Sequence, residues 1–183
     1  MTDQALRPGF EIHGDAAVLA RASPADLTDL TCRATDATFY RDGLTPEQTA
    51  ANLRVVEISG PTCAAAAQAD HQHLAAAFIG DELAGYVIAT RHAPDDLELD
   101  WLMVDPAFHG SGVAAGLMQA GIAWLGQDQP MWLNVIAYNA RAIAFYEKFG
   151  FAVDPDATTP HAIPHHIMRR SARSMLPGAD ASA

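Results

Sequence analysis

One segment decides the fold of this chain: Leu97-Glu-Leu-Asp-Trp-Leu-Met-Val104, then Asp105-Pro-Ala-Phe-His-Gly-Ser-Gly112, then an apolar run over 113–125. It predicts a strand, a glycine turn and a helix, because Asp105-Pro106 ends the first apolar stretch and Gly110 and Gly112 let the backbone approach another group closely. A helix that begins directly after a glycine turn offers unpaired N–H groups and a partial positive charge. The segment therefore predicts an anion site, most naturally for phosphate.

Two other classes of phosphate-binding loop fit this segment less well. It lacks the Gly-Lys-Ser/Thr of the P-loop nucleotide hydrolases. Gly110-x-Gly112-x-x-Ala115 satisfies a relaxed dinucleotide fingerprint, but the residues 105–109 separate it from its strand. The next expected strand, 131–135, also ends without the acidic residue that would bind a ribose. A nucleotide-binding Rossmann domain is therefore the weaker alternative.

The same segment resembles the acyl-CoA motif of the GNAT N-acetyltransferase superfamily, Val-x-Pro-x-x-Arg/Gln-Gly-x-Gly-x-Gly/Ala. The matching residues are Val104-Asp-Pro-x-x-His109-Gly-Ser-Gly112-Val-Ala114, and His109 stands where the family carries Arg or Gln. The resemblance implies that acetyl-CoA is the acyl donor. It implies that the coenzyme is held by the end of the strand and by the turn, through Leu102, Met103, Val104, His109, Gly110, Ser111, Gly112, Val113 and Ala114.

A second match follows farther along the chain. The residues Leu133-x-Val135-x-x-x-Asn139-x-x-Ala142-x-x-Phe145-Tyr146-x-Lys148-x-Gly150-Phe151 resemble the superfamily's other motif throughout. Two motifs in the right order occur by chance much less often than either alone. The resemblance implies an α+β, three-layer GNAT fold, in which helices cover both faces of a mixed, mostly antiparallel central sheet. We expect a single domain over 15–170, a loose segment over 1–14 and a disordered tail over 171–183.

Tyr146 and Asn139 are the candidate functional residues of the second motif. Many GNAT enzymes use a tyrosine at the position of Tyr146 as a general acid toward the coenzyme A sulfur, and the resemblance places this residue against the coenzyme. A phenol of pKa near 10 can protonate a thiolate of pKa about 8–9. The alternative is that Phe145 and Tyr146 are only core aromatics of an amphipathic helix. Asn139 can cap its helix and also contact the coenzyme.

Glu98 and Asp100 are the two candidates for the base that deprotonates an amine. Side chains alternate along a strand, so both would share one face, which would also carry Leu102 and Val104. Some GNAT enzymes use a glutamate at the spacing of Glu98, six residues before the motif valine, directly or through water. Glu98 is therefore preferred over Asp100, with ordinary solvation at a strand end as the alternative. A backbone N–H near Met103 or Val104 would polarise the thioester carbonyl.

The chain before the glycine turn predicts two helices and a hairpin. We expect a first strand over 16–22, and then helices that begin at Ser23-Pro24 and at Thr45-Pro46, the second with a capping box completed by Gln48. Apolar runs over 74–79 and 84–91 flank a turn at 80–83 and predict an antiparallel hairpin. Further strands are expected over 131–136 and 165–170. The segment 61–70 is rich in alanine and indicates no particular element.

The turn between the two helices, 35–44, is the candidate acceptor-binding segment. In GNAT proteins the corresponding segment tends to line the acceptor pocket, which here the resemblance alone implies. An ordinary solvated loop is the alternative. The candidate acceptor contacts are Asp36, Phe39, Tyr40 and Asp42.

Composition narrows the classes of partner. A formal net charge of −11 disfavours nucleic acid and is compatible with a cationic substrate such as an amine, or simply with solubility. No apolar run is long enough to span a bilayer, and the first residues, 1–5, lack the basic and apolar regions of a signal peptide. These features predict a cytoplasmic protein with free thiols at Cys32 and Cys63. The histidines at 71, 73, 161, 165 and 166 lack a third ligand at metal-binding spacing, so we expect no metal.

The resemblance of the two motifs implies an N-acetyltransferase. It would move an acetyl group from acetyl-CoA directly to a primary amine of a small molecule or peptide, since neither cysteine nor any serine stands in a recognisable nucleophile setting. The main alternative is a GNAT-like module that binds acyl-CoA without turnover. A homodimer is possible within the superfamily, although nothing in the sequence identifies an interface or the acceptor.

Overall fold

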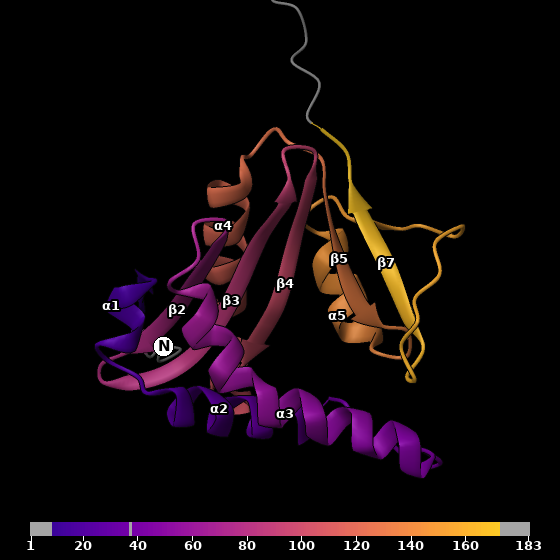
Figure 1. Ribbon diagram of the computed structural model, residues 1–183, viewed down its shortest axis with the longest axis horizontal. Coiled ribbons are helices and arrows are strands. Elements are labelled where there is room, and N and C mark those ends of the chain that lie inside the picture. Colours follow the sequence, from indigo (N-terminus) through magenta and orange to yellow (C-terminus); the bar gives the residue numbers. More distant parts are fainter. Residues whose placement is uncertain (1–8, 37, 173–183) are drawn as a thin grey trace, which may run out of the picture.

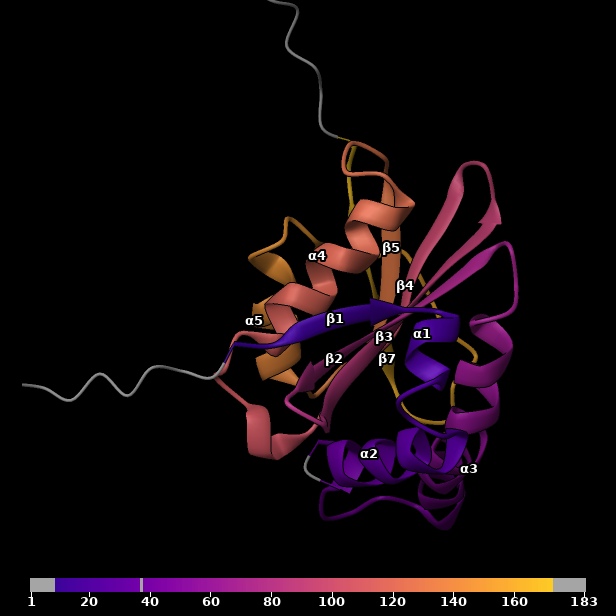
Figure 2. The same ribbon diagram turned by 90° about the vertical axis from the view of Figure 1, so that its left-hand side faces the viewer.

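The computed structural model describes residues 9–36 and 38–172. Figures 1 and 2 show one sheet with helices on both of its faces. The elements are β1 (Glu11–Gly14), α1 (Ala16–Leu19), α2 (Pro24–Asp36), α3 (Pro46–Ala66), β2 (Gln72–Ile79), β3 (Glu82–Ala93), β4 (Asp96–Val104), a 3-10 turn (Pro106–Phe108), α4 (Val113–Leu125), β5 (Met131–Ile136), α5 (Ala140–Glu147), β6 (Ala152–Val153) and β7 (His165–Arg170).

The sheet is mixed and mostly antiparallel, as predicted. Its strand order is β1-β2-β3-β4-β5-β7-β6. Only β4 and β5 run parallel among the paired strands that the structure describes. These two strands share a single pair, Glu98 with Trp132, and then diverge, so that they splay apart below it in Figure 1. The expected strand–turn–helix unit around 97–125 is confirmed by β4 and α4.

Two apolar clusters hold the three layers together. One joins α4 and α5 to one face of the sheet and is built around Val87, Leu99 and Leu117. The other joins α1, α2 and α3 to the opposite face, where Leu27 and Cys63 pack with strand residues. No helix among the described residues is both long enough and apolar enough to cross a membrane.

The predicted helix starts are confirmed because short-range bonds define them. At α2, the Ser23 hydroxyl accepts from the N–H of Asp26 at 3.2 Å, and the Asp26 carboxylate accepts from the Ser23 N–H at 2.7 Å. At α3, Thr45 and Gln48 form the predicted capping box. That helix continues through the unassigned alanine-rich stretch to Ala66, with Pro61 inside it.

The N-terminal expectations need correction. The strand predicted over 16–22 is wrong: this stretch contains α1, and the strand β1 lies earlier, within the segment that was expected to be loose. Asp15, at φ 50°, turns the chain away from the sheet edge, and its carboxylate accepts from the N–H of Leu74 at 3.0 Å. Val18 and Ala22 are then buried at helical spacing. Residues 1–8 and 173–183 of the expected loose segment and tail lie outside the described residues.

A bulge in β4 corrects the predicted face of that strand. Glu98 pairs with Thr90 and Asp100 with Ile88, so the two acids do share one face. The register then shifts at Trp101, which has φ 47°. Because a bulge inserts an extra residue, Leu102 and Val104 turn to the other face and pack against the α4 cluster. The prediction that they share the face of the two acids is therefore wrong.

Candidate active site

The glycine turn has the backbone conformation that its sequence predicts. Gly110 and Gly112 both have positive φ, 82° and 95°, which residues with a Cβ rarely adopt. The Ser111 hydroxyl donates to the carbonyl of Phe108 at 2.6 Å and accepts from the N–H of Val113 at 3.3 Å. These bonds fix the turn so that α4 begins with Val113, and the positive end of its helix dipole faces the turn.

A cavity of about 370 Å³ lies next to this turn and reaches into the gap between β4 and β5. Of the predicted site residues, its wall contains Leu102, Met103, Val104, His109, Ala114, Asn139 and Tyr146. Gly110, Ser111, Gly112 and Val113 are not part of the wall, but their neighbours His109 and Ala114 are. The structure thus brings the strand end, the turn and the second motif together around one cavity.

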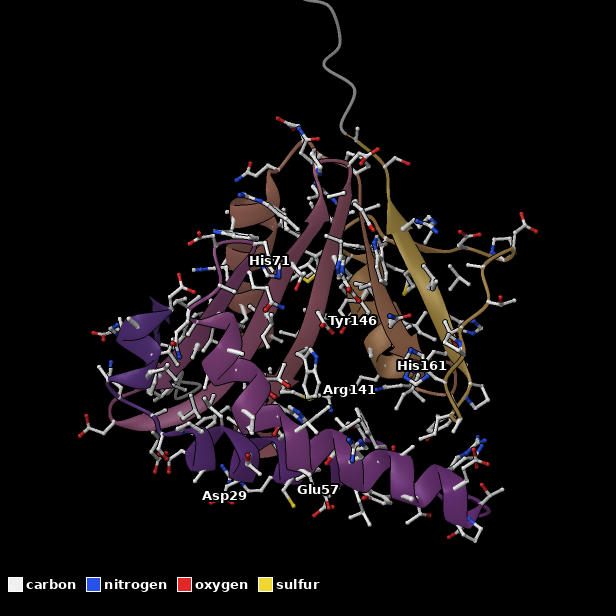
Figure 3. The ribbon with its side chains drawn as sticks, in the orientation of Figure 1. Asp29, Glu57, His71, Arg141, Tyr146 and His161 are labelled. Atoms are coloured by element: carbon white, nitrogen blue, oxygen red, sulfur yellow. The ribbon has the colours of Figure 1, made fainter. Side chains whose placement is uncertain are left out.

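Tyr146 enters the wall from α5, and Figure 3 shows it at the side of the gap between the splayed strands. Its ring packs edge-on against Phe145 and Phe151, at centroid distances of 5.5 and 6.4 Å. Burial, and then the negative charge of Asp100, raise the pKa of Tyr146 to about 12. The phenol therefore keeps its proton at neutral pH and is available as a donor.

Asp100, the second choice for the base, lines the cavity. Burial, and then the charge of Glu98, raise the pKa of Asp100 to about 7, against the effect of the hydrogen bond that it accepts from the Trp101 N–H at 2.9 Å. A carboxyl group with that pKa exchanges protons readily near neutral pH, which is what a general base requires.

Glu98, the preferred candidate, does not line the cavity. It is only 6% exposed, and it lies 2.7 Å from Nε2 of His92 and accepts from the Asn134 amide at 3.4 Å. Burial raises the pKa of Glu98, although His92 and Asn134 act in the opposite direction. Asn134 is itself part of the cavity wall, so its amide links Glu98 to the cavity.

A cation reaches the glycine turn from α5. Nη1 of Arg141 lies 3.1 Å from Nδ1 of His109, and both side chains belong to the cavity wall. Burial, and then the charge of Arg141, lower the pKa of His109, so a neutral imidazole can accept from the guanidinium. Sequence reasoning missed Arg141. The only signal was its position inside the second motif, between Asn139 and Ala142.

Of the four candidate acceptor contacts, one lies in the cavity wall, and its contact with an acceptor stays a prediction. Phe39 lines the cavity, whereas Asp36, Tyr40 and Asp42 do not. His161 and His165, which the sequence suggests are solvated or pocket-lining rather than metal ligands, also line the cavity, with ring centroids 4.5 Å apart.

The capping role of Asn139 is confirmed. Its side-chain oxygen accepts from the N–H of Ala142 at 3.1 Å, which closes the first turn of α5. Asn139 also lines the cavity, so its second expected role, contact with the coenzyme, stays a prediction.

Comparison with known proteins agrees with this geometry. The chain matches the acetyltransferase (GNAT) family over residues 38–151, which is more than half of its length. It is 36% identical over 78 residues to uncharacterized N-acetyltransferases of Mycobacterium tuberculosis and Mycobacterium bovis. The matched region is 42% of this chain and 50% of each relative, so the chain spans about half the length of the curated relatives that it matches.

Solved structures with the same fold are more distant in sequence. The PaiA N-acetyltransferase from Thermoplasma acidophilum, solved in complex with coenzyme A, has a TM-score of 0.69 and 17% identity, covering 89% of this chain and 99% of that one. The ribosomal-protein-S18-alanine N-acetyltransferase from Escherichia coli has a TM-score of 0.60 and 18% identity, covering 96% and 100%. By its matched domain, its two motifs and its fold, the chain belongs to the acetyltransferase (GNAT) family.

Proposed function

We propose that this protein is an N-acetyltransferase that moves an acetyl group from acetyl-CoA directly to a primary amine. One observation carries the proposal: Asp100 and Tyr146 line the same cavity, and burial leaves the first as a base with a pKa of about 7 and the second as an acid with a pKa of about 12. Direct transfer needs such a pair, because the amine must lose a proton and the leaving thiolate must gain one.

The donor would be seated by the glycine turn and by the splayed strands. The positive end of α4 and the guanidinium of Arg141 provide electrostatic attraction for a pyrophosphate, and Arg141 offers the cation that His109 lacks when neutral. The gap between β4 and β5 is wide enough to prevent their pairing after Glu98 and Trp132. An extended pantetheine chain could pair with these strand edges, which suits acyl-CoA.

The transfer itself would proceed in one displacement. Asp100 accepts a proton from the ammonium form of the acceptor, and the freed amine attacks the thioester carbon. The backbone N–H of Met103 or Val104, on the edge that β5 leaves unpaired, would stabilise the negative oxygen that forms. As the carbon–sulfur bond breaks, Tyr146 donates its proton to the thiolate, and the positively charged nitrogen of the intermediate releases its extra proton to solvent. Solvent then returns one proton to the phenolate and takes one from Asp100, so the net products are the amide, the free thiol and one proton.

The test is acetyl transfer by the purified full chain. Release of coenzyme A thiol and the acetylated product, identified by mass, would be measured with acetyl-CoA and a panel of primary amines. We expect Asp100→Asn to lower kcat/KM by at least about 100-fold. Asp95→Asn, which removes an exposed carboxylate from the same hairpin, should leave the rate unchanged.

Binding and turnover separate this proposal from the inactive module. Calorimetry would measure acetyl-CoA binding to the wild type and to Asp100→Asn, with NADH as the control ligand. Binding of acetyl-CoA in the micromolar range without turnover of any amine would contradict the proposal and favour an acyl-CoA-binding module. Binding of NADH instead would contradict the assignment of the glycine turn.

A further inference from the structure

Part of the cavity wall comes from α3 and the connection before it, from the bulge in β4, and from the segment that leads into β7. These residues are Thr38 and Phe39 in the connection between α2 and α3, Val55 on α3, Trp101 at the β4 bulge, and His161 and His165 before and at the start of β7. We call this set the acceptor wall. Figure 3 shows His161 beside the ends of β5 and β7 that face α3. The wall therefore lines the same cavity as Asp100 but lies outside the glycine turn.

Hydrogen bonds hold the acceptor wall in place. The carbonyl of Phe39 accepts from the Tyr138 hydroxyl at 2.7 Å and from the Asn52 amide at 3.3 Å. The Arg41 guanidinium stacks over the Tyr138 ring, 3.9 Å from its centroid, and so helps to hold that tyrosine in place. Two separate elements thus fix the backbone that carries the Phe39 ring.

A hydrogen bond also joins the segment that carries His161 to α3. The Gln48 amide donates to the carbonyl of Ala162 at 3.1 Å, directly beside His161. His165 in turn lies 2.6 Å, through Nδ1, from the carbonyl of Ile163. A wall held at both ends is preorganised, so little conformational entropy is lost when a ligand packs against it.

The chemistry of the wall is apolar and aromatic, with little charge. Among the described residues that line the cavity, Asp100 is the one carboxylate. Asp29 and Glu57 are exposed on the outer side of α2 and α3 (Figure 3) and do not line the cavity. Burial lowers the pKa of His165, so this imidazole is neutral at neutral pH.

We propose that the acceptor is a monoamine with a flat apolar body, which packs between Phe39 and the two histidines while its ammonium group meets Asp100. This inference rests on the proposed function and names its substrate class. A second ammonium would lose its water against Phe39, Val55 and Trp101 without gaining a carboxylate, which is unfavourable. The wall therefore selects against polyamines even though the protein as a whole is acidic.

The first experiment compares three amines as acceptors for the purified full chain with saturating acetyl-CoA. They are 2-phenylethylamine, which has a ring, ethylamine, which has the same reactive end without it, and spermidine, which has several charges. We expect kcat/KM for 2-phenylethylamine to exceed the values for the other two amines by about tenfold or more, since burial of its ring against the wall is favourable. Equal or faster acetylation of spermidine would overturn the inference and leave the proposed function intact.

Variants of the acceptor wall test which of its residues determine the preference among these amines. Val55→Asp places a carboxylate in the wall and should raise the spermidine to 2-phenylethylamine ratio of kcat/KM about tenfold. Leu53→Asp is the matched control, because Leu53 is on the same helix, is 53% exposed and does not line the cavity. Phe39→Ala should remove most of the preference for 2-phenylethylamine over ethylamine. An unchanged ratio in both wall variants, with the fold intact by circular dichroism, would refute the assigned wall.

A binding measurement keeps the two proposals apart. Calorimetry would titrate 2-phenylethylamine and spermidine into the full chain saturated with coenzyme A. Tighter binding of the aromatic amine supports the inference even if no acetyl transfer is found, an outcome that would contradict only the proposed function. Tighter binding of spermidine would contradict the inference whatever the rate of transfer.

Discussion

Burial, and then a neighbouring carboxylate that does not line the cavity, make Asp100 more basic than an ordinary aspartate. Glu98 lies two positions away on the same face of β4, and its negative charge is the second cause, after burial, of the raised pKa of Asp100. His92 acts in the other direction on both carboxylates. In the proposed reaction Glu98 is therefore a positioning residue that adjusts the base.

Replacing Glu98 should move the pH dependence of the reaction. Asp100 works only when deprotonated, so kcat/KM should rise with pH through the pKa of Asp100, which is about 7. Glu98→Gln removes the neighbouring charge and lowers that pKa, so the acid limb should shift to lower pH. His92→Ala should shift it to higher pH, because the stabilising partner of the carboxylates is lost.

The controls for this pair are exposed residues of the same types. Glu57, on α3, and His71, before β2, are exposed and do not line the cavity. Glu57→Gln and His71→Gln should therefore leave the acid limb of the profile unchanged. Profiles of kcat/KM from pH 5 to 9 would be measured for all four variants. A shift of the same sign in Glu98→Gln and His92→Ala would show that the two residues act only through the structure.

Tyr146→Phe should separate chemistry from binding. The change removes a proton donor and leaves the ring that packs against Phe145 and Phe151. We expect kcat to fall by about 100-fold while the Kd of acetyl-CoA changes by less than threefold or so. Steady-state kinetics and calorimetry would be compared, and a parallel loss of rate and affinity would make Tyr146 a structural residue.

Arg141→Gln should weaken binding of the donor more than the chemistry. A charge-assisted hydrogen bond contributes about 1.5–3 kcal/mol, so the Kd of acetyl-CoA should rise at least tenfold or so. S-acetyl-pantetheine, which has no pyrophosphate, should bind both forms equally. Lys148→Gln, an exposed basic residue at the end of the same helix, is the control for loss of charge. Equal losses for both donors would contradict a pyrophosphate contact.

At the scale of the element, helix starts set the positions of the acceptor wall. The capping box at Thr45 begins α3, and the next residues of that helix carry Gln48 and Val55 to the segment before β7. Thr45→Ala should lower the free energy of unfolding by about 1 kcal/mol, because one N–H of the first turn loses its acceptor. Urea unfolding would measure this, with Thr45→Ser as the variant that keeps the hydroxyl. Equal stability of Thr45→Ala and wild type would contradict the role of the cap.

Elements that local chemistry defines were predictable from sequence, and elements that tertiary contacts define were not. The helix starts at Ser23, Thr45 and Asn139 could be predicted, because each of these side chains accepts a hydrogen bond from the backbone N–H three residues later. The first strand was misplaced because the turn at Asp15 depends on Leu74, far along the chain. The bulge at Trp101 gave no signal in the alternation of β4, since a residue with positive φ there is set by its partner strand.

The residues of the candidate site also fall into two groups, those that the motifs predict and those that only contacts between distant segments place in the cavity. Motif positions placed His109, Asn139 and Tyr146 around one cavity, because the motif already encodes the strand, the turn and the two helices. The sequence could not show that Asp100 lines the cavity and Glu98 does not, since the alternation of side chains puts both on the same face of β4. Contacts between distant segments, such as Arg141 with His109, need the folded chain.

At the scale of the whole molecule, the divergence of β4 and β5 opens the candidate site and also lowers the free energy of unfolding. The two strands pair once and then separate, and the layers on either face close around the gap. Polar groups remain inside it, including a buried Asn134 oxygen that has no hydrogen-bond partner among the described residues. Buried carboxylates in such a gap oppose folding when they are charged.

Asp100→Asn should therefore make the protein more stable at alkaline pH while it removes activity. Burial and Glu98 raise the pKa of Asp100 in the folded state from 3.8 to about 7, so the folded protein holds a proton that the unfolded chain releases. The stability that this proton contributes is complete below pH of about 4 and is lost as pH rises to about 7, with a ceiling of about 4 kcal/mol for a shift of about three units.

Urea unfolding at pH 5 and pH 8 would test this linkage. Wild type should lose more stability between the two pH values than Asp100→Asn does, and the variant should be the more stable of the two at pH 8. Asp95→Asn removes an exposed carboxylate and changes the net charge equally, so it should follow the wild type. A variant that is less stable than wild type at pH 8 would mean that the Asp100 carboxylate contributes more through its hydrogen bond to the Trp101 N–H than it costs through burial.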